Sequence, residues 1–117
     1  MKEYKVFEGR TVKEELSKLL GEGYFPLNLK EVYDWKKKNK DKRWFDTSTV
    51  YIKGIVRTAA LKEIKNIENF YVKGVRIVFA GGNGSSNLIG DNDLSNNGRF
   101  VGVKNKIRKN KKAGLNG

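Results

Sequence analysis

One stretch of this chain, residues 81–98 (GGNGSSNLIGDNDLSNNG), is built almost entirely from amino acids that favour turns and loops. Fifteen of its eighteen residues are Gly, Asn, Ser or Asp, and the exceptions are two leucines and one isoleucine. Gly, Asn and Asp tolerate positive φ, and Asn, Asp and Ser hydrogen-bond their own backbone. A loop of this length is uncommon inside a compact domain, so it is either functional or a solvated surface segment. We therefore expect a long irregular loop, here called the polar tract, late in the fold.

Lys, Glu, Gln, Met and Trp are among the amino acids that the polar tract lacks. Because the rest of the chain is rich in Lys and Glu, a chance absence of both over this length is on the order of a one-in-a-hundred event. These five are the amino acids that no codon of the form NNC specifies, where N is any base. Mutation of the adenines in AAC codons of a template would produce codons of this form, including those for Asn, Ser, Gly and Asp. The composition therefore predicts a segment that is diversified at the level of its gene.

Two capping boxes predict two helices ahead of the tract. In each box the side chain of the first residue accepts a hydrogen bond from the backbone N–H three residues later, and the glutamate at that later position accepts from the backbone N–H of the first residue. The two pairs are Thr11 with Glu14 and Asn28 with Glu31. Apolar residues at helical spacing follow both boxes. The helices are expected over residues 12–20 and 29–38, with an ordered connection at residues 24–27.

Alternating apolar residues predict strands on both sides of these helices. One strand is expected near the N-terminus, several in a run before the polar tract, and one directly after it. Residues 61–67 are equally compatible with a short helix. The expected strands are residues 3–8, 49–53, 55–61, 70–72, 75–80 and 99–103, with 70–72 and 75–80 paired as a hairpin.

The polar tract, the GRFVGV strand at residues 98–103 and the order of the earlier elements resemble the variable proteins of archaeal (Nanoarchaeota-related) diversity-generating retroelements. The resemblance covers residue 1 to about residue 103. It implies an α+β fold of the C-type lectin-like class, with two helices, a small mainly antiparallel sheet, paired terminal strands and a long late loop region. A single domain over residues 1–103 would then be followed by a flexible basic tail, residues 104–117.

The same resemblance implies a non-enzymatic protein that binds a protein or cell-surface ligand. It is compatible with a surface or extracellular role, while the sequence itself gives no location. Short polar side chains offer adaptable hydrogen bonding, as in antibody loops, and a packed scaffold limits the ordering entropy that binding costs. The expected variable, ligand-binding residues are Gly82, Asn83, Gly84, Ser85, Ser86, Asn87, Asp91, Asn92, Asp93, Ser95, Asn96 and Asn97.

Three apolar residues interrupt the tract: Leu88, Ile89 and Leu94. They either anchor the loop to the scaffold or contact the ligand, and anchoring is favoured because a long loop must be held. Arg99, just beyond the tract, is either a binding anchor or a charge on a strand face. The tract itself contains no aromatic residue, which predicts weak binding, since interface hot spots favour Trp, Tyr and Arg.

The chain departs from sugar-binding C-type lectins. It has neither the Glu-Pro-Asn or Gln-Pro-Asp run nor the Trp-Asn-Asp sequence with which those proteins hold calcium and hexose hydroxyls, and it has no cysteines for their disulfides. Asp91 and Asp93, with Asn92 between them, offer oxygen ligands, but two carboxylates make a weak calcium site. We expect no bound metal and no cofactor.

The composition also restricts catalysis and membrane insertion. With no cysteine and no histidine, disulfides, thiol nucleophiles, histidine bases and the usual zinc sites are excluded. An enzyme that combined Asp91 or Asp93 with Lys73 has no supporting spacing. No apolar run has the length of a membrane span, and none forms a signal-peptide core near the N-terminus.

The net charge of +12 raises a second hypothesis, a small nucleic-acid-binding protein. The charge is concentrated in two clusters, residues 36–43 and residues 104–117, and the rest of the chain is close to neutral. In this hypothesis Trp35, Trp44 and Phe45 are stacking platforms beside the first cluster. The alternative places these aromatic residues in the core and the lysines at a solvated helix end, where they suit the helix dipole.

Overall fold

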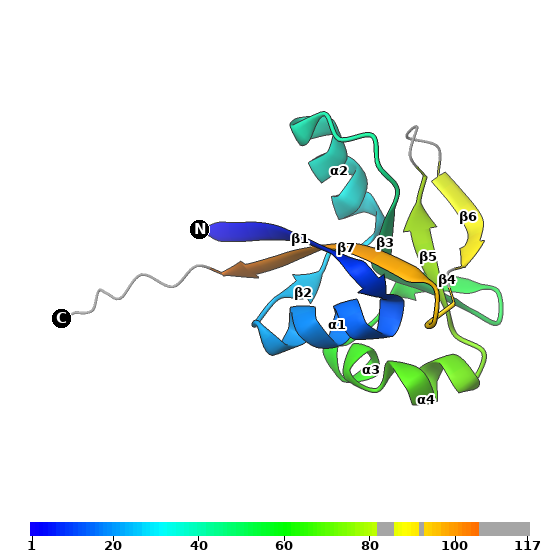
Figure 1. Cartoon of the computed structure of the whole chain (residues 1–117). Helices are drawn as coiled ribbons and strands as arrows, with labels where there is room; N and C mark the ends of the chain where they lie inside the picture. The colour runs from blue at the N-terminus through cyan, green and yellow to red at the C-terminus, as the bar shows by residue number, and fades with distance from the viewer. Residues whose placement is uncertain (82–85, 92, 106–117) are drawn as a thin grey trace.

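The computed structural model describes residues 1–81, 86–91 and 93–105, and over residues 86–91 it describes the backbone alone. These residues form four helices and a mixed sheet of seven strands, so the fold is α+β as predicted (Figure 1). Five of the predicted variable residues (Gly82, Asn83, Gly84, Ser85 and Asn92) lie outside the described residues, as does the tail after residue 105.

The first and last described strands pair along most of their length. β1 (Lys2–Thr11) and β7 (Asn97–Asn105) are antiparallel, with Phe7 opposite Phe100 and Lys2 opposite Asn105. The sheet order is β1-β7-β3-β5-β6, and β2 and β4 pair with β7 and β3 outside this path. The described pairs are antiparallel except β3 with β7. The remaining strands are β2 (Phe25–Pro26), β3 (Phe45–Ile52), β4 (Ile55–Thr58), β5 (Arg76–Ala80) and β6 (Ser86–Asp91).

Both predicted capping boxes form, and each starts a helix where the sequence places it. Thr11 Oγ1 accepts from the Glu14 N–H at 3.2 Å, and Asn28 Oδ1 accepts from the Glu31 N–H at 2.9 Å. Each glutamate accepts in return from the backbone N–H of its partner. The helices that follow are α1 (Val12–Gly21) and α2 (Leu29–Asn39).

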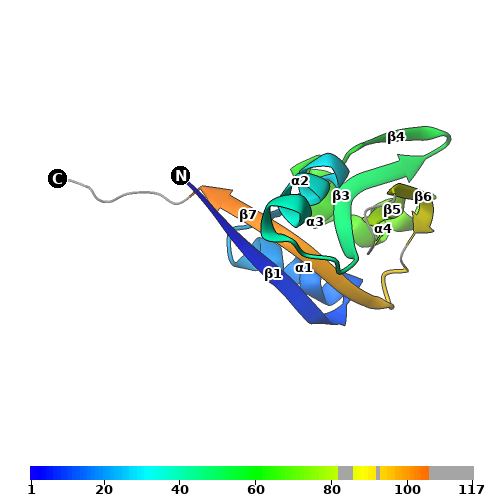
Figure 2. The same ribbon diagram turned by 90° about the horizontal axis from the view of Figure 1, so that it is seen from above.

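The helices α1 and α2 cover opposite sides of the β1–β7 pair (Figures 1 and 2). Strand alternation therefore sends Phe7 and Phe100 into one core with Leu16 and Leu19 of α1. The neighbouring strand residues, Val6 among them, pack on the other side against Leu27, Val32 and Phe45. Each fully buried apolar side chain contributes about 1.5–3 kcal/mol, so the terminal strands are stabilised from both faces.

The sequence prediction of a 70–72 and 75–80 hairpin is wrong, because residues 67–72 are helical. α4 (Ile67–Val72) buries Ile67, packs Phe70 against the core of α1, and follows α3 (Leu61–Lys65), the short helix that was the open alternative. Gly74, at φ 97°, ends α4, and its N–H donates to the Tyr71 carbonyl. A Lys-Gly pair suits both a hairpin turn and a helix C-terminus, since both need one residue with positive φ.

The predicted strand over residues 55–61 ends at Thr58, because the next residues start α3. The Glu63 carboxylate accepts from the Ala60 N–H at 2.8 Å and from both Arg57 guanidinium nitrogens at 2.8 Å. The Arg57 contact, followed by the backbone hydrogen bond, lowers the pKa of Glu63 from 4.5 to about 2. Glu63 thus connects α3 to β4.

The expectation of an irregular loop throughout residues 81–98 is also wrong in part. β6 occupies residues 86–91 and pairs with β5, with Ser86 opposite Ala80 and Asn87 opposite Phe79. β7 begins at Asn97, two residues earlier than predicted. Strand pairing satisfies backbone groups that β5 would otherwise leave without a partner, and this non-local gain outweighs the turn preference of Gly, Asn and Ser.

We predict that Gly98→Ala destabilises the protein strongly. A Cβ at residue 98 would stand 2.6 Å from Val12 Cα and 2.9 Å from Val12 N, and both are backbone atoms that cannot rotate away. Overpacking of this kind costs about 1–3 kcal/mol. Chemical denaturation should show a loss of about 3 kcal/mol in the free energy of unfolding.

Gly21→Ala is the matched control, since a Cβ at Gly21 meets nothing within 4 Å. Gly21 lies in the last turn of α1, where alanine is the better helix former, so the control should be unchanged or up to about 1 kcal/mol more stable. Equal free energies for the two variants would contradict the packing of α1 on β7.

Candidate ligand-binding site

The start of the polar tract is held by α2 through a buried lysine. Lys36 is only 5% exposed, and its Nζ donates to the carbonyl of Arg43 and, at 2.7 Å, to the carbonyl of Gly81. Tyr33, on the same helix, also hydrogen-bonds the backbone of Gly81. Burial lowers the pKa of Lys36, and Asp41 opposes that effect by its charge. Lys36 is therefore a structural donor, in contrast to the solvated lysine expected from the sequence.

The end of the tract is held by the first turn of α1. The N–H groups of Val12 and Lys13 donate to the carbonyls of Asn96 at 2.8 Å and Leu94 at 3.1 Å. The first N–H groups of a helix have no partner within the helix, so the tract supplies acceptors that α1 requires. Leu94 is half-buried and packs on the core of α1, as the anchoring hypothesis predicts. The side chains of Leu88 and Ile89 lie outside the described part of the chain.

Arg99 fastens the strand that follows the tract. Its backbone N–H donates to Asp46 Oδ2 at 3.0 Å, and Asp46 is fully buried. Its guanidinium donates to Glu8 at 2.7 Å and to the carbonyl of Trp44 at 3.2 Å, and lies 4.6 Å from the centre of the Trp44 ring. Arg99 therefore serves the scaffold, which favours its interpretation as a charge on a strand face.

Three of the predicted variable residues line a hollow of about 580 Å³. Among the described residues, Trp44 and Phe79 also line it; both are half-buried, and their rings meet edge to face with centres 6.4 Å apart. The rim is therefore polar and exposed, and two aromatic rings lie beside it. The variable residues that line it are Ser95, Asn96 and Asn97.

The other described variable residues lie on the elements next to this hollow. Asp93 is exposed, and its Oδ1 accepts from the N–H of Ser95 at 3.3 Å, so it shapes the turn that carries the rim. Ser86, Asn87 and Asp91 belong to β6, where Asn87 stands opposite Phe79 of the hollow. The described members of the predicted set therefore lie on β6, on the turn that follows it and at Asn97, the first residue of β7.

Sequence reasoning missed the aromatic part of this site. Trp44 was considered as a platform for nucleic acid or as a core residue, and Phe79 stands in an apolar strand without any local mark of function. Both reach the hollow through non-local contacts: β5 pairs with β3 and β6, and β3 follows Trp44 directly. Phe45, the third proposed platform, is fully buried and cannot stack on a base.

The described residues show no gathering of three or more acidic side chains that could hold a metal ion. Within the same residues, no helix has the length and apolar character needed to cross a membrane. Comparison with known proteins found no matching family model, no matching curated protein and no matching solved structure. The site must therefore be interpreted from its own geometry.

We predict that Lys36→Met loosens the start of the tract. The carbonyls of Arg43 and Gly81 would lose their ammonium donor, and a buried acceptor left without a partner costs about 1–3 kcal/mol. Denaturation should show that loss, and amide hydrogen exchange should quicken in β6. Lys37→Met is the control, because Lys37 is exposed and a surface substitution changes stability by only about 0.5 kcal/mol. Identical amide hydrogen exchange rates in β6 of the two variants would contradict the role of Lys36 as an anchor of the tract.

Proposed function

We propose that this chain is a non-enzymatic ligand-binding protein, the variable protein of a diversity-generating retroelement, built on a C-type lectin-like scaffold. The observation that carries the proposal is the hollow at which the exposed residues Ser95, Asn96 and Asn97 meet the rings of Trp44 and Phe79. Predicted variable residues thus lie beside aromatic side chains that belong to residues outside the polar tract. Such an arrangement combines a constant apolar anchor with an interchangeable polar rim.

The contacts that hold the two ends of the tract support this proposal because they do not depend on variable side chains. Lys36, Val12 and Lys13 all donate to main-chain carbonyls of the tract, which every amino acid provides. Leu94 in the core and Gly98 against α1 lie outside the predicted variable set, whereas the side chain of Asp93, within the set, accepts from the Ser95 N–H inside the turn. Variation at the rim therefore leaves the frame intact.

The aromatic rings also change the expected strength of binding. The tract without aromatic residues predicted a weak interface, whereas Trp and Tyr dominate interface hot spots. Trp44 supplies such a group from the scaffold, and Arg99 stacks on its ring and fixes it. We infer that the partner, a protein or cell-surface molecule, places an apolar group against Trp44 and Phe79 while its polar groups meet the rim.

The nucleotide sequence of the locus tests the proposed class. We predict that the codons of the twelve variable residues end predominantly in C, and that a near-copy of this region nearby carries adenines where the gene varies. Residues such as Leu94 and Gly98 should have codons that match the copy. Codons with no bias toward C, or a locus without a near-copy, would contradict the proposal without any binding assay.

The tolerance of the rim to substitution tests the same proposal in the protein. We predict that Ser95→Tyr and Asn96→Asp each change the free energy of unfolding by only about 0.5 kcal/mol, since both residues are exposed and the Asn96 contact uses its carbonyl. Leu94→Ser, one position away, should cost about 2 kcal/mol or more, because Leu94 packs on the core. A large loss of stability for the Ser95 and Asn96 variants would show that the rim is not a variable surface.

A further inference from the structure

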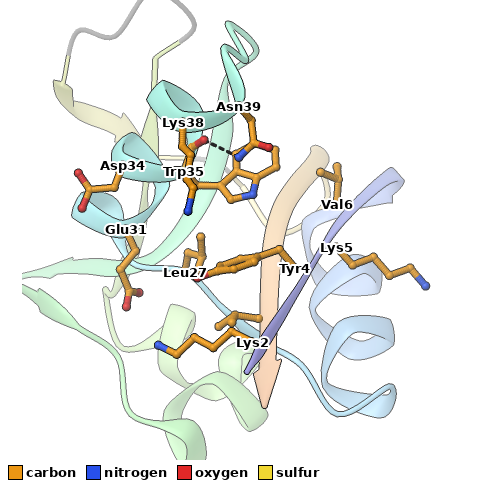
Figure 3. A pocket seen from close by; sticks show the side chains of 11 residues that line it. Lys2, Tyr4, Lys5, Val6, Leu27, Glu31, Asp34, Trp35, Lys38 and Asn39 are labelled. Atoms are coloured by element: carbon orange, nitrogen blue, oxygen red, sulfur yellow. Dashed lines mark hydrogen bonds between the residues drawn. The ribbon is translucent and has the colours of Figure 1, made fainter. Parts of the chain in front are cut away.

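A second hollow, of about 600 Å³, lies between β1 and α2, on the α2 side of the β1–β7 pair (Figure 3). It shares no lining residue with the hollow at Trp44. Val6, Leu27 and Val103 contribute its apolar part, and two aromatic residues, Tyr4 and Trp35, also line it. Tyr4 is 48% exposed, so much of its side chain is open to solvent. We call this hollow the β1–α2 groove.

Two carboxylates line the groove, and each has one local partner. Glu31 Oε1 accepts from the Asn28 N–H at 2.9 Å within the capping box, and Asp34 Oδ2 pairs with Lys30 at 3.2 Å. The side-chain N–H of Asn39 donates to the carbonyl of Trp35 at 2.8 Å, so this donor is used as well. Each carboxylate therefore has one contact with a residue on or next to α2.

The donor groups are not engaged in the same way. Among the described residues, none accepts from the ammonium groups of Lys2 and Lys38 or from the indole N–H of Trp35. Figure 3 shows the Tyr4 ring between Lys2 on one side and Trp35 and Lys38 on the other, whereas Lys5 points away. Lys5 is paired with Glu22 at 2.8 Å, so it does not contribute free charge. The groove thus combines two unpaired positive charges, a free donor and an exposed aromatic ring.

We propose that the β1–α2 groove binds single-stranded nucleic acid, with an unpaired base against Tyr4 and phosphates at Lys2 and Lys38. Phosphates are acceptors and carry negative charge, and every base offers a planar face to an aromatic ring. The volume lies in the usual range for a bound small molecule and suits one nucleotide. Lysines 37, 40 and 42 are exposed as well and add positive charge at the C-terminal end of α2 and just beyond it.

A peptide strand fits these groups less well. It brings N–H donors in the same number as carbonyl acceptors, whereas a phosphate brings acceptors alone and a full negative charge for Lys2 and Lys38. This second site does not rest on the proposed function at the polar tract. It also differs from a site built on Phe45, which is buried.

The test uses the full chain and a fluorescein-labelled single-stranded oligonucleotide of twelve uridines, with anisotropy measured across salt concentrations. Tyr4→Leu should weaken binding about tenfold or more by removing the stacking ring, and Tyr4→Phe should stay within about twofold of the wild type. The double variant Lys2→Gln/Lys38→Gln should reduce the slope of log K against log salt by about 1.4, at about 0.7 for each phosphate contact.

Lys62→Gln/Lys65→Gln is the charge-matched control, because both lysines are exposed on α3, away from the groove. The inference is overturned if the wild type fails to bind at low salt, if Tyr4→Leu binds like the wild type, or if the two double variants have equal slopes. If Tyr4→Leu does not fold, the oligonucleotide is titrated into the Trp44→Phe variant instead, and the fluorescence of Trp35 reports whether the groove is occupied. Quenching by the oligonucleotide supports the groove, and unchanged fluorescence overturns it.

Discussion

The polar tract depends on hydrogen bonds that its neighbours donate to its main-chain carbonyls. At one end Lys36 reaches the carbonyl of Gly81, and at the other the first two N–H groups of α1 reach Asn96 and Leu94. Both sets of donors would be costly to bury alone, one as an ammonium group and the other as helix N–H groups without partners. The tract and the two helices therefore stabilise one another. Because a carbonyl belongs to the backbone, this stabilisation does not change when the tract's side chains change.

The sheet explains how two helices reach the same segment from different sides. α1 and α2 pack on opposite faces of the β1–β7 pair, and each face has its own buried cluster. The tract leaves β5 and returns into β7, so its ends pass close to the C-terminal end of α2 and the N-terminal end of α1. The same packing leaves the outer face of β1 only partly covered by α2, where Tyr4 and Trp35 border a groove. The two candidate binding surfaces thus follow from a single arrangement of helices on strands.

The features predicted correctly from the sequence are those set by residues a few positions apart. Both capping boxes and the start of both long helices depend on contacts three residues apart. The break at residue 54 between two predicted strands falls in the turn between β3 and β4, where Lys53 and Gly54 both have positive φ. The errors arise where the structure of a segment depends on residues that are distant in the sequence. β6 exists because β5 needs a partner, Lys36 is buried because Gly81, 45 residues away, needs a donor, and Phe79 reaches the hollow through β6. A Lys-Gly pair at residues 73 and 74 was compatible with two structures, and the packing of Ile67 selected the helix.

In the proposed function, the separation of aromatic from variable residues has an energetic consequence. Short side chains such as Asn, Ser and Asp lose little entropy on binding, but each contact also contributes little. An aromatic ring provides more free energy, and Trp44 is already ordered by Arg99, Phe79 and its position directly before β3. Its entropy is therefore lost during folding and not during binding. Under this proposal the scaffold contributes the same part of the affinity to every variant, while the residues at the rim decide which partner is bound.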